Sequence, residues 1–283
     1  VNDQNWPAFM LCDVLGNMGF AYTFDDSPVR FLAGDTVYAL PDTQLQELLS
    51  GNLILDASAA KALVDRGYAG QVGCSPGEAI APFGGEECTD VDFFGPYVGD
   101  FFSHKATPLQ AIRQLNIADS AKVLSHIIDH DRKRVAPGMI LFENALGGKI
   151  AVFACRIGSS DPDTRHLVCY QRQWVMRQIL AWMAPESMPV FVESPKDFAV
   201  QCWDDGNRLL ACITNLSYDN TDEITVEINV AGLTPAAVRY IDDDGASQSL
   251  TEYIEDVSTD AQMLWRIQRP MPLLRSLVMI VER

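Results

Sequence analysis

The pattern of apolar and polar residues changes about two thirds of the way along the chain. In the first part, short apolar runs alternate with segments whose apolar residues recur every three or four positions. The runs predict buried strands and the helical spacing predicts amphipathic helices, so this part has the alternating order of an α/β domain. After residue 195 only short apolar or alternating runs remain, with turn sequences such as "DDGN" between them. These runs predict a small antiparallel β-sandwich.

A proline-rich segment, "APESMPVFVESP", separates the two patterns and follows the longest predicted helix, at 164–183. Residues 1–190 are therefore expected to form the α/β domain, and residues 191–283 the sandwich domain. The apolar face of the long helix is predicted from the helical spacing of large side chains, which are Leu167, Tyr170, Trp174, Met176, Ile179 and Leu180.

Two features of the first part predict how its strands are arranged. Three consecutive apolar residues at Leu53–Leu55 suit a strand that is buried on both faces. We therefore expect a mostly parallel sheet with this strand at its centre. The sequence "GMILFENALGGKIAVFAC" predicts two further strands joined by a Gly-Gly turn, as in a hairpin.

The stretch "LILDASAAKALVDRG" (53–67) joins the strand at Leu53–Leu55 to a helix through a very short turn. Enzymes with a nucleophile elbow place their reactive residue at such a turn, so Asp56 and Ser58 are candidate reactive groups. A carboxylate just before a helix also accepts hydrogen bonds from its first N–H groups and interacts favourably with its dipole. The second interpretation is favoured, with Asp56 capping the helix through the N–H of Ser58 or Ala59.

Acidic residues outnumber basic residues by 38 to 21, so the 283-residue chain carries a formal net charge of −17. Such a surface repels nucleic acid and anionic membranes, and it is compatible with a neutral ligand such as a sugar. No apolar stretch approaches the ~18 residues of a membrane-spanning helix. The seven cysteines are odd in number and lack C-x-x-C spacing, which favours structural thiols in a reducing, cytoplasmic compartment. That location discounts the glycosylation sequon at Asn215.

Other candidate groups have a structural explanation beside the chemical one. Cys74 in "VGCSPG" resembles part of a nucleophile motif, but no strong helix follows it. His126 and His130 are four residues apart, a spacing that suits a metal on a helix, yet the H-E-x-x-H pattern is absent. Carboxylates cluster at Glu86–Glu87, at 204–205 and at 242–244. The last two clusters fall in predicted turns, where Asp bonds locally and calcium binding is an alternative. No phosphate-binding glycine loop occurs, and neither a cofactor nor a metal is assigned.

Four phrases of the sequence resemble the C-terminal part of multidomain bacterial glycoside hydrolases, similar in plan to family 42 β-galactosidases. They lie within 40–74 and 145–230 and read "LLSGNLILDASAAKALVDRGYAGQVGC", "GGKIAVFAC", "QRQWVMRQILAWMAPESMPVFV" and "LLACITNLSYDNTDEITVEIN". In those enzymes a catalytic barrel comes first, then a flavodoxin-like domain similar to class I glutamine amidotransferases, then a sandwich. The resemblance implies that this chain, which begins at Val1, is a fragment containing the last two domains.

The same resemblance implies that amidotransferase chemistry has been lost. In active amidotransferases a cysteine occupies the elbow, with a glycine two residues on, and a His-x-Glu pair follows a later strand. Aligned on the elbow, Asp56 stands at the cysteine position and Ser58 at the glycine position. His166 follows the later strand, but Leu167 and Val168 come after it without an acidic residue. No catalytic residue is therefore expected in this chain.

The implied role is that of a non-catalytic region. It shapes the active site of an upstream catalytic barrel of the same polypeptide, or forms homo-oligomer contacts, and a carbohydrate is the substrate of the parent enzyme. Two alternatives stay open. One is a stand-alone hydrolase or amidotransferase that uses Cys74 and a histidine such as His166. The other is a carbohydrate-binding module whose exposed coplanar rings form a sugar platform, with the sandwich aromatics Trp203, Tyr218, Tyr240, Tyr253 and Trp265.

Overall fold

The computed structural model describes most of the chain. The described residues are 14–22, 26–81, 84–102, 112–155, 169–185, 188–193, 198–217, 219–229, 235–258 and 263–282. None of the helices in these stretches is both long enough and apolar enough to cross a membrane.

The chain divides into two compact units. The first consists of Val1–Val14 and Ser27–Ala184, and the second of Leu15–Asp26 and Pro185–Arg283. The division after Ala184 falls in the proline-rich segment, near the boundary expected at 190. The sequence pattern assigned Leu15–Asp26 to the first domain, whereas the structure places this segment in the second unit.

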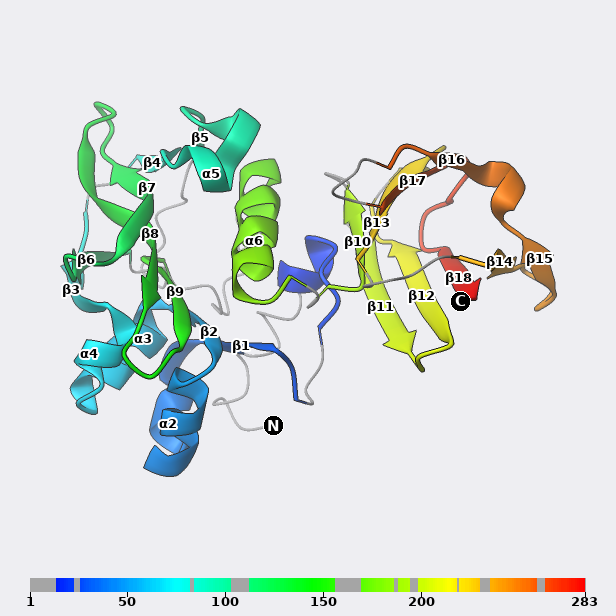
Figure 1. The fold of residues 1–283 in the computed structure, drawn as a ribbon. Coiled ribbons are helices and arrows are strands. Elements are labelled where there is room, and N and C mark those ends of the chain that lie inside the picture. The colour runs from blue at the N-terminus through cyan, green and yellow to red at the C-terminus, as the bar shows by residue number, and fades with distance from the viewer. Residues whose placement is uncertain are drawn as a thin grey trace. The chain divides into compact units, whose positions relative to one another are not determined.

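A seven-stranded mixed sheet forms the frame of the first unit (Figure 1). In spatial order its strands are β1 (Val29–Leu32), β2 (Asn52–Asp56), β9 (Lys149–Phe153), β8 (Arg134–Glu143), β7 (Lys122–Ile128), β4 (Gly85–Cys88) and β5 (Phe101–Phe102). The first three run parallel to one another, and from β9 onward each strand pairs antiparallel with the next.

The prediction of a mostly parallel sheet is therefore wrong. The strand at Leu53–Leu55 is buried on both faces as predicted, but it lies second from one edge of the sheet and not at its centre. The physical reason is that a tight turn reverses the chain, so strands joined by a hairpin must be antiparallel. The predicted hairpin is present as β8 and β9, and β7, β4 and β5 extend the sheet from it in antiparallel order.

Helices flank this sheet, and a small second sheet adds to the unit. The helices are α2 (Asp42–Leu49), α3 (Ala57–Asp65), α4 (Ala69–Val72), α5 (Val91–Phe94) and α6 (Tyr170–Met183), with 3₁₀ turns η2 (Gly34–Ala39) and η3 (Gly95–Tyr97). Strands β3 (Cys74–Ala79) and β6 (Arg113–Ile117) form the small sheet. Both α2 and α3 contact β2, and α5 packs against α6 (Figure 1).

The second unit contains two antiparallel sheets. One has the order β10 (Val190–Glu193), β13 (Ile224–Ile228), β17 (Met263–Ile267) and β16 (Ile254–Asp256). The other has the order β11 (Phe198–Asp204), β12 (Arg208–Asn215), β18 (Ser276–Glu282), β14 (Ala237–Ile241) and β15 (Ser247–Ser249), followed along the chain by the 3₁₀ turn η5 (Thr251–Tyr253). The strands predicted by alternation after residue 195 are all present as β11, β12, β13, β14, β17 and β18.

One apolar core joins the two sheets of the second unit. Its buried residues come from both sheets, for example Val226 on β13 and Ile213 on β12. The early segment contributes to the same unit, because Met18 forms a parallel bridge with Phe198 and the ring of Phe20 stacks 5.2 Å from that of Phe191. In a sandwich, every second side chain of each strand points inward, so the two sheets bury a shared core of this kind.

The turn between β8 and β9 is tied to two helical segments by one side chain. Asn144 Nδ2 donates to the carbonyl oxygens of Leu49 at 2.8 Å and Gln71 at 3.2 Å. Its Oδ1 accepts from the N–H groups of Leu146 at 2.9 Å and Gly148 at 3.0 Å. The amide thus connects the hairpin to the ends of α2 and α4, which lie far from it in the sequence.

We expect Asn144→Ala to lower the free energy of unfolding by about 1–3 kcal/mol, because it leaves buried backbone groups without partners. Urea denaturation measures the change. Asn116→Ala is the matched control, since Asn116 is exposed and makes one side-chain bond, to the carbonyl of Ser75. That control is expected to stay within about 0.5 kcal/mol of the parent, and equal losses for both variants would contradict the role of Asn144.

Candidate functional site

The elbow predicted at Asp56 is present, and the predicted cap is confirmed. Asp56 is the last residue of β2 and the N-cap of α3, and its Oδ1 accepts from the N–H of Ala59 at 2.8 Å. The side chain is almost fully buried, whereas Ser58 in the first turn of the helix is half-buried. A carboxylate in this position satisfies an N–H group that the helix cannot pair internally.

A second segment also donates to the same carboxylate. The N–H of Gly34 lies 3.0 Å from Oδ1 and 3.1 Å from Oδ2 of Asp56. Gly34 follows β1 and has a φ of +61°, which glycine adopts without steric cost. The Asp56 carboxylate therefore connects the start of η2 to the start of α3, and backbone donors from two elements converge on it.

The other predicted nucleophile does not have the environment of a reactive thiol. Cys74 opens β3 and is buried, and burial raises the pKa of its thiol to about 12. At neutral pH the group is therefore protonated, whereas the thiolate is the nucleophilic form. His166, the histidine proposed to act with it, lies outside the described residues.

The two histidines with metal-like spacing lie on a strand and on its following turn, not on a helix. His126 belongs to β7, and its Nδ1 is 3.2 Å from Thr89 Oγ1. Burial, together with the nearby positive charge of Arg134, lowers the pKa of His126. His130 is exposed in the turn after the strand. No group of three or more His, Cys, Asp or Glu side chains in the described part of the chain is arranged to hold a metal ion.

A buried ion pair that sequence reasoning missed connects α6 to the antiparallel half of the sheet. Arg172 Nη2 on α6 donates to Glu86 Oε2 on β4 at 2.6 Å. Ser125 Oγ on β7 donates to the other oxygen, Oε1 of Glu86. All three residues are buried, so this polar cluster joins one helix and two strands inside the first unit.

The guanidinium of Arg172 stays charged in this setting. Its Cζ lies 4.8 Å from the ring centroid of Phe102 and 5.3 Å from that of Phe153, and its Nη1 lies 3.2 Å from Met139 Sδ. Burial alone would lower the pKa of Arg172, but the carboxylate of Glu86 raises it above its usual value. Because an unpaired buried charge is costly, each member of the pair depends on the other.

The space around the ion pair is filled. A Cβ at Gly138 on β8 would lie 2.7 Å from Glu86 Oε1 and 2.7 Å from Ser125 Oγ, closer than real Cβ contacts. Burial also raises the pKa of two neighbouring thiols, that of Cys88 to about 12 and that of Cys155 to about 11. These thiols are therefore protonated at neutral pH, and Cys155 Sγ accepts a weak hydrogen bond from Arg172 Nη2 at 3.8 Å.

The sequence did contain a signal for this cluster. Arg172, Val175, Met176 and Ile179 recur at helical spacing, and α6 buries all four. The predicted apolar face included Tyr170, which is exposed in the structure. An arginine on the apolar stripe of a helix predicts a buried partner carboxylate, but the spacing does not say which one.

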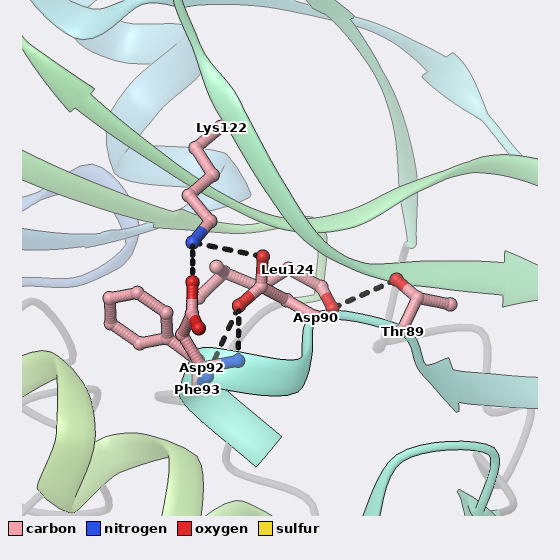
Figure 2. A network of polar contacts seen from close by, with 6 residues as sticks. All are labelled: Thr89, Asp90, Asp92, Phe93, Lys122 and Leu124. Atoms are coloured by element: carbon pink, nitrogen blue, oxygen red, sulfur yellow. Dashed lines mark hydrogen bonds and ion pairs between the residues drawn. The ribbon is translucent and has the colours of Figure 1, made fainter. Parts of the chain in front are cut away.

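The acidic sequence "TDVDFF" forms a second polar network, shown in Figure 2. Asp90 caps α5, accepting at 3.1 Å from the N–H groups of Asp92 and Phe93. Lys122 Nζ on β7 lies 3.0 Å from a carboxylate oxygen of Asp90 and 3.1 Å from one of Asp92. Both carboxylates are therefore balanced by the same cation, which attaches α5 to β7. Glycoside cleavage instead uses two carboxylates that face the substrate from opposite sides.

The carboxylates predicted in the sandwich turns make the expected local bonds. Asp205 Oδ1 accepts from the N–H groups of Asn207 at 2.9 Å and Arg208 at 2.8 Å. Asp242 Oδ1 accepts in the same way from Ala246 at 2.8 Å. These bonds stabilise the β11–β12 and β14–β15 turns, which is the structural interpretation of both clusters.

The four sandwich aromatics that the structure describes do not form a flat platform. Tyr240 and Trp265 are buried, and the rings of Tyr240 and Tyr253 meet edge to face at 84°. Trp203 is exposed on β11, and Tyr218 lies outside the described residues. A sugar platform needs exposed coplanar rings, so this arrangement does not favour the carbohydrate-binding alternative.

Comparison with known proteins found similarity in structure alone. No protein-family model matches the chain, and no curated protein sequence matches it. Among solved structures that match is alpha-L-fucosidase isoenzyme 2 from Paenibacillus thiaminolyticus. It has a TM-score of 0.62 and 11% identity, over 98% of this chain and 45% of that chain.

Two β-galactosidases show the same relationship. The E323A catalytic mutant of Gan42B, a GH42 beta-galactosidase from G. stearothermophilus, has a TM-score of 0.51 and 12% identity, over 98% of this chain and 36% of that one. The beta-galactosidase from Bacillus circulans sp. alkalophilus has a TM-score of 0.54 and 14% identity, over 99% and 38% of the two chains. The chain thus shares the fold of a part of these glycoside hydrolases and spans less than half their length.

We expect Asp56→Ala to lower the free energy of unfolding by about 2–4 kcal/mol. Loss of a cap costs roughly 0.5–2 kcal/mol, and the buried N–H of Gly34 left without an acceptor adds roughly 1–3 kcal/mol. Asp56→Asn keeps one acceptor oxygen and should lose less. Asp35→Ala, at an exposed position in η2, is the control in the same denaturation experiment. A loss for Asp56→Ala no larger than that of the control would show that the carboxylate does not hold the elbow.

Breaking the buried ion pair should cost more than breaking an exposed one. Glu86→Gln leaves the charge of Arg172 uncompensated and is expected to cost about 3–5 kcal/mol, whereas the double variant Glu86→Leu with Arg172→Met should recover most of that loss. Glu87→Gln breaks the more exposed pair with Arg134 and should cost about 0–1 kcal/mol. If the loss of unfolding free energy in the double variant equals the sum of the losses in Glu86→Leu and Arg172→Met alone, the two side chains are not coupled and the prediction is wrong.

Proposed function

We propose that this chain is a non-catalytic C-terminal region of a carbohydrate-active enzyme of the glycoside hydrolase class. The supporting observation is the coverage of the structural matches. Nearly the whole chain aligns with glycoside hydrolases, yet it accounts for only 36–45% of their length. A chain of this kind is expected to work as part of a longer enzyme, and fold similarity alone supports the class but not the reaction.

The catalytic barrel of the parent enzyme is proposed to precede this region in the same polypeptide. Its substrate would be a neutral carbohydrate, with which the acidic surface is compatible. Within this proposal the first unit is a relative of the amidotransferase-like domain, with a mixed sheet in place of the expected mostly parallel one. Its role is to shape the active site of the barrel or to make contacts between copies.

The elbow geometry supports the absence of amidotransferase chemistry. An active elbow presents a nucleophile and leaves backbone N–H donors free for the oxyanion that forms during the reaction. Here Asp56 stands at the nucleophile position, and its own carboxylate accepts from the N–H groups of Gly34 and Ala59. The rival that uses Cys74 also lacks support, because burial keeps that thiol protonated.

We expect the purified chain to hydrolyse neither nitrophenyl glycosides nor glutamine faster than the buffer blank. Colour release from the glycosides and ammonia release from glutamine measure the two activities. Turnover that disappears in Cys74→Ala or His166→Ala would overturn the proposal in favour of a stand-alone enzyme. Turnover unchanged in both variants would also overturn it, since the chain would then carry an active site elsewhere.

The coding sequence upstream of Val1 provides an independent test. The proposal expects it to encode a barrel with a pair of catalytic carboxylates. A start codon immediately upstream would contradict the proposed position in a longer enzyme.

A further inference from the structure

Four neighbouring strands of the first unit place a row of side chains on one face of the sheet. In register across β5, β4, β7 and β8, the row consists of Phe101, Glu87, His126 and Pro137. Directly paired residues of antiparallel strands lie on the same face, with Cβ atoms roughly 4.5–5.5 Å apart. Glu86, which binds Arg172 on α6, precedes Glu87 on β4 and faces the other way. The row therefore lies on the face opposite α6.

Arg134 on β8 adds a guanidinium to this row. Its Nε lies 2.7 Å from Glu87 Oε2 and its Nη2 lies 3.0 Å from Oε1, so the two planar groups meet side by side. These bonds lower the pKa of Glu87, so the carboxylate is charged and keeps lone pairs that the arginine does not use. The side chains of Arg134 and Glu87 are 54% and 25% exposed. A ligand in solvent can therefore reach both.

His126 contributes a second hydrogen-bonding group to the row. Thr89 Oγ1 lies 3.2 Å from its Nδ1, which leaves Nε2 as the ring nitrogen without a hydrogen bond among the described residues. Burial, and after it the charge of Arg134, lowers the pKa of His126, so the ring is neutral at neutral pH. A neutral imidazole beside a carboxylate offers a further hydrogen bond without adding charge.

The aromatic end of the row carries a second arginine. Phe101 is 48% exposed, and Arg132 Cζ lies 4.2 Å from its ring centroid. Arg132 has a φ of +62° in the β7–β8 turn, a conformation that glycine and asparagine adopt more readily. Glycine would suit the turn itself better, so the strain at this exposed position points to a role for the side chain above the ring.

The charges around the row balance one another. Three cations at the β7–β8 turn are matched by three carboxylates, and the six residues are Arg132, Lys133, Arg134, Glu87, Asp129 and Asp131. Glu87 occupies two donors of Arg134, so that fork is not available to grip a phosphate or a carboxylate ligand. The negative charge of the whole chain also repels anions. The chemistry of the row therefore fits a ligand that is neutral and polar.

We propose that Phe101, Glu87, His126, Arg132 and Arg134, called the sheet-face site below, bind a neutral sugar. A sugar hydroxyl both donates and accepts, so neighbouring hydroxyls can donate to Glu87 and accept from the two arginines, with one bonded to His126 Nε2. The C–H groups of the sugar pack beside the ring of Phe101. The choice of a carbohydrate among neutral polar ligands rests on the function proposed above, whereas a binding site on the first unit goes beyond it.

Saturation-transfer NMR on the full 283-residue chain, titrated with methyl β-glucoside and methyl β-galactoside, tests the proposal. The parent chain should bind at least one of them saturably, with a dissociation constant on the order of millimolar, because an exposed site buries little of its ligand. Methyl β-glucuronide, which adds a carboxylate, and inorganic phosphate should bind at least about tenfold more weakly. Binding of neither neutral glycoside overturns the proposal, and so does tighter binding of either anion.

Arg132→Asn separates a binding role from a role in the turn. Asparagine suits the left-handed conformation, so the melting temperature should not fall, whereas the dissociation constant of the sugar should rise at least about tenfold. Leu274→Asn is the matched control, because Leu274 has a φ of +56° at an exposed position of the second unit. Equal effects of the two variants on binding overturn the proposal. A lower melting temperature for Arg132→Asn with an unchanged dissociation constant overturns it too.

Glu87→Gln tests the carboxylate. It should weaken sugar binding at least about tenfold at little cost in stability, as expected for an exposed ion pair. Glu255→Gln breaks the exposed pair with Arg266, 2.9 Å long, in the second unit and should leave binding unchanged. A dissociation constant that is the same in Glu87→Gln as in the parent overturns the sheet-face site.

These measurements detect binding and not hydrolysis. Absence of binding therefore leaves the proposed membership in a glycoside hydrolase standing. Turnover by the chain would overturn the proposed non-catalytic role without changing the dissociation constants that define this site.

Discussion

The ion pair between Glu86 and Arg172 is the constraint on which the antiparallel half of the first unit depends. It joins the long helix α6 to β4, and through Ser125 it also reaches β7. Removing two charges from water is costly, and the cost is offset only when the geometry and further bonds are good. Glycine at position 138 leaves the required space on β8. The position of α6 therefore depends on a polar contact as well as on apolar packing.

The carboxylates of the first unit follow one principle, because each of those discussed is satisfied within the unit. Asp56 accepts from two backbone segments, Glu86 pairs with Arg172, and Asp90 and Asp92 share Lys122. An enzyme of the glycoside hydrolase kind instead keeps carboxylates available for an acid and for a base or nucleophile. Internal satisfaction is the pattern expected where acidic residues stabilise a fold, and it supports the proposed non-catalytic role.

In the second unit a buried polar side chain fixes the conformation of two surface loops. Asn215 is fully buried, and its amide fixes two loops whose outer surface is apolar. A satisfied buried polar group specifies one loop conformation where an apolar residue would allow several. Leu274 keeps a strained φ in the same place.

The sequence by itself determined the features that depend on neighbours along the chain. Asp56 caps α3 because its acceptor lies three residues before the Ala59 N–H, and the alternation after residue 195 predicted β11, β12, β13, β14, β17 and β18. It did not predict β10, β15 or β16, which complete the two sheets of the second unit. The Gly-Gly turn likewise predicted the β8–β9 hairpin. Tertiary structure alone decided the sheet order, the bond from Gly34 to Asp56 across 22 residues, and the pairing of Arg172 with Glu86 across 86. Periodicity states which face of an element is buried, but the partner on that face is chosen by packing between segments that are distant in the sequence.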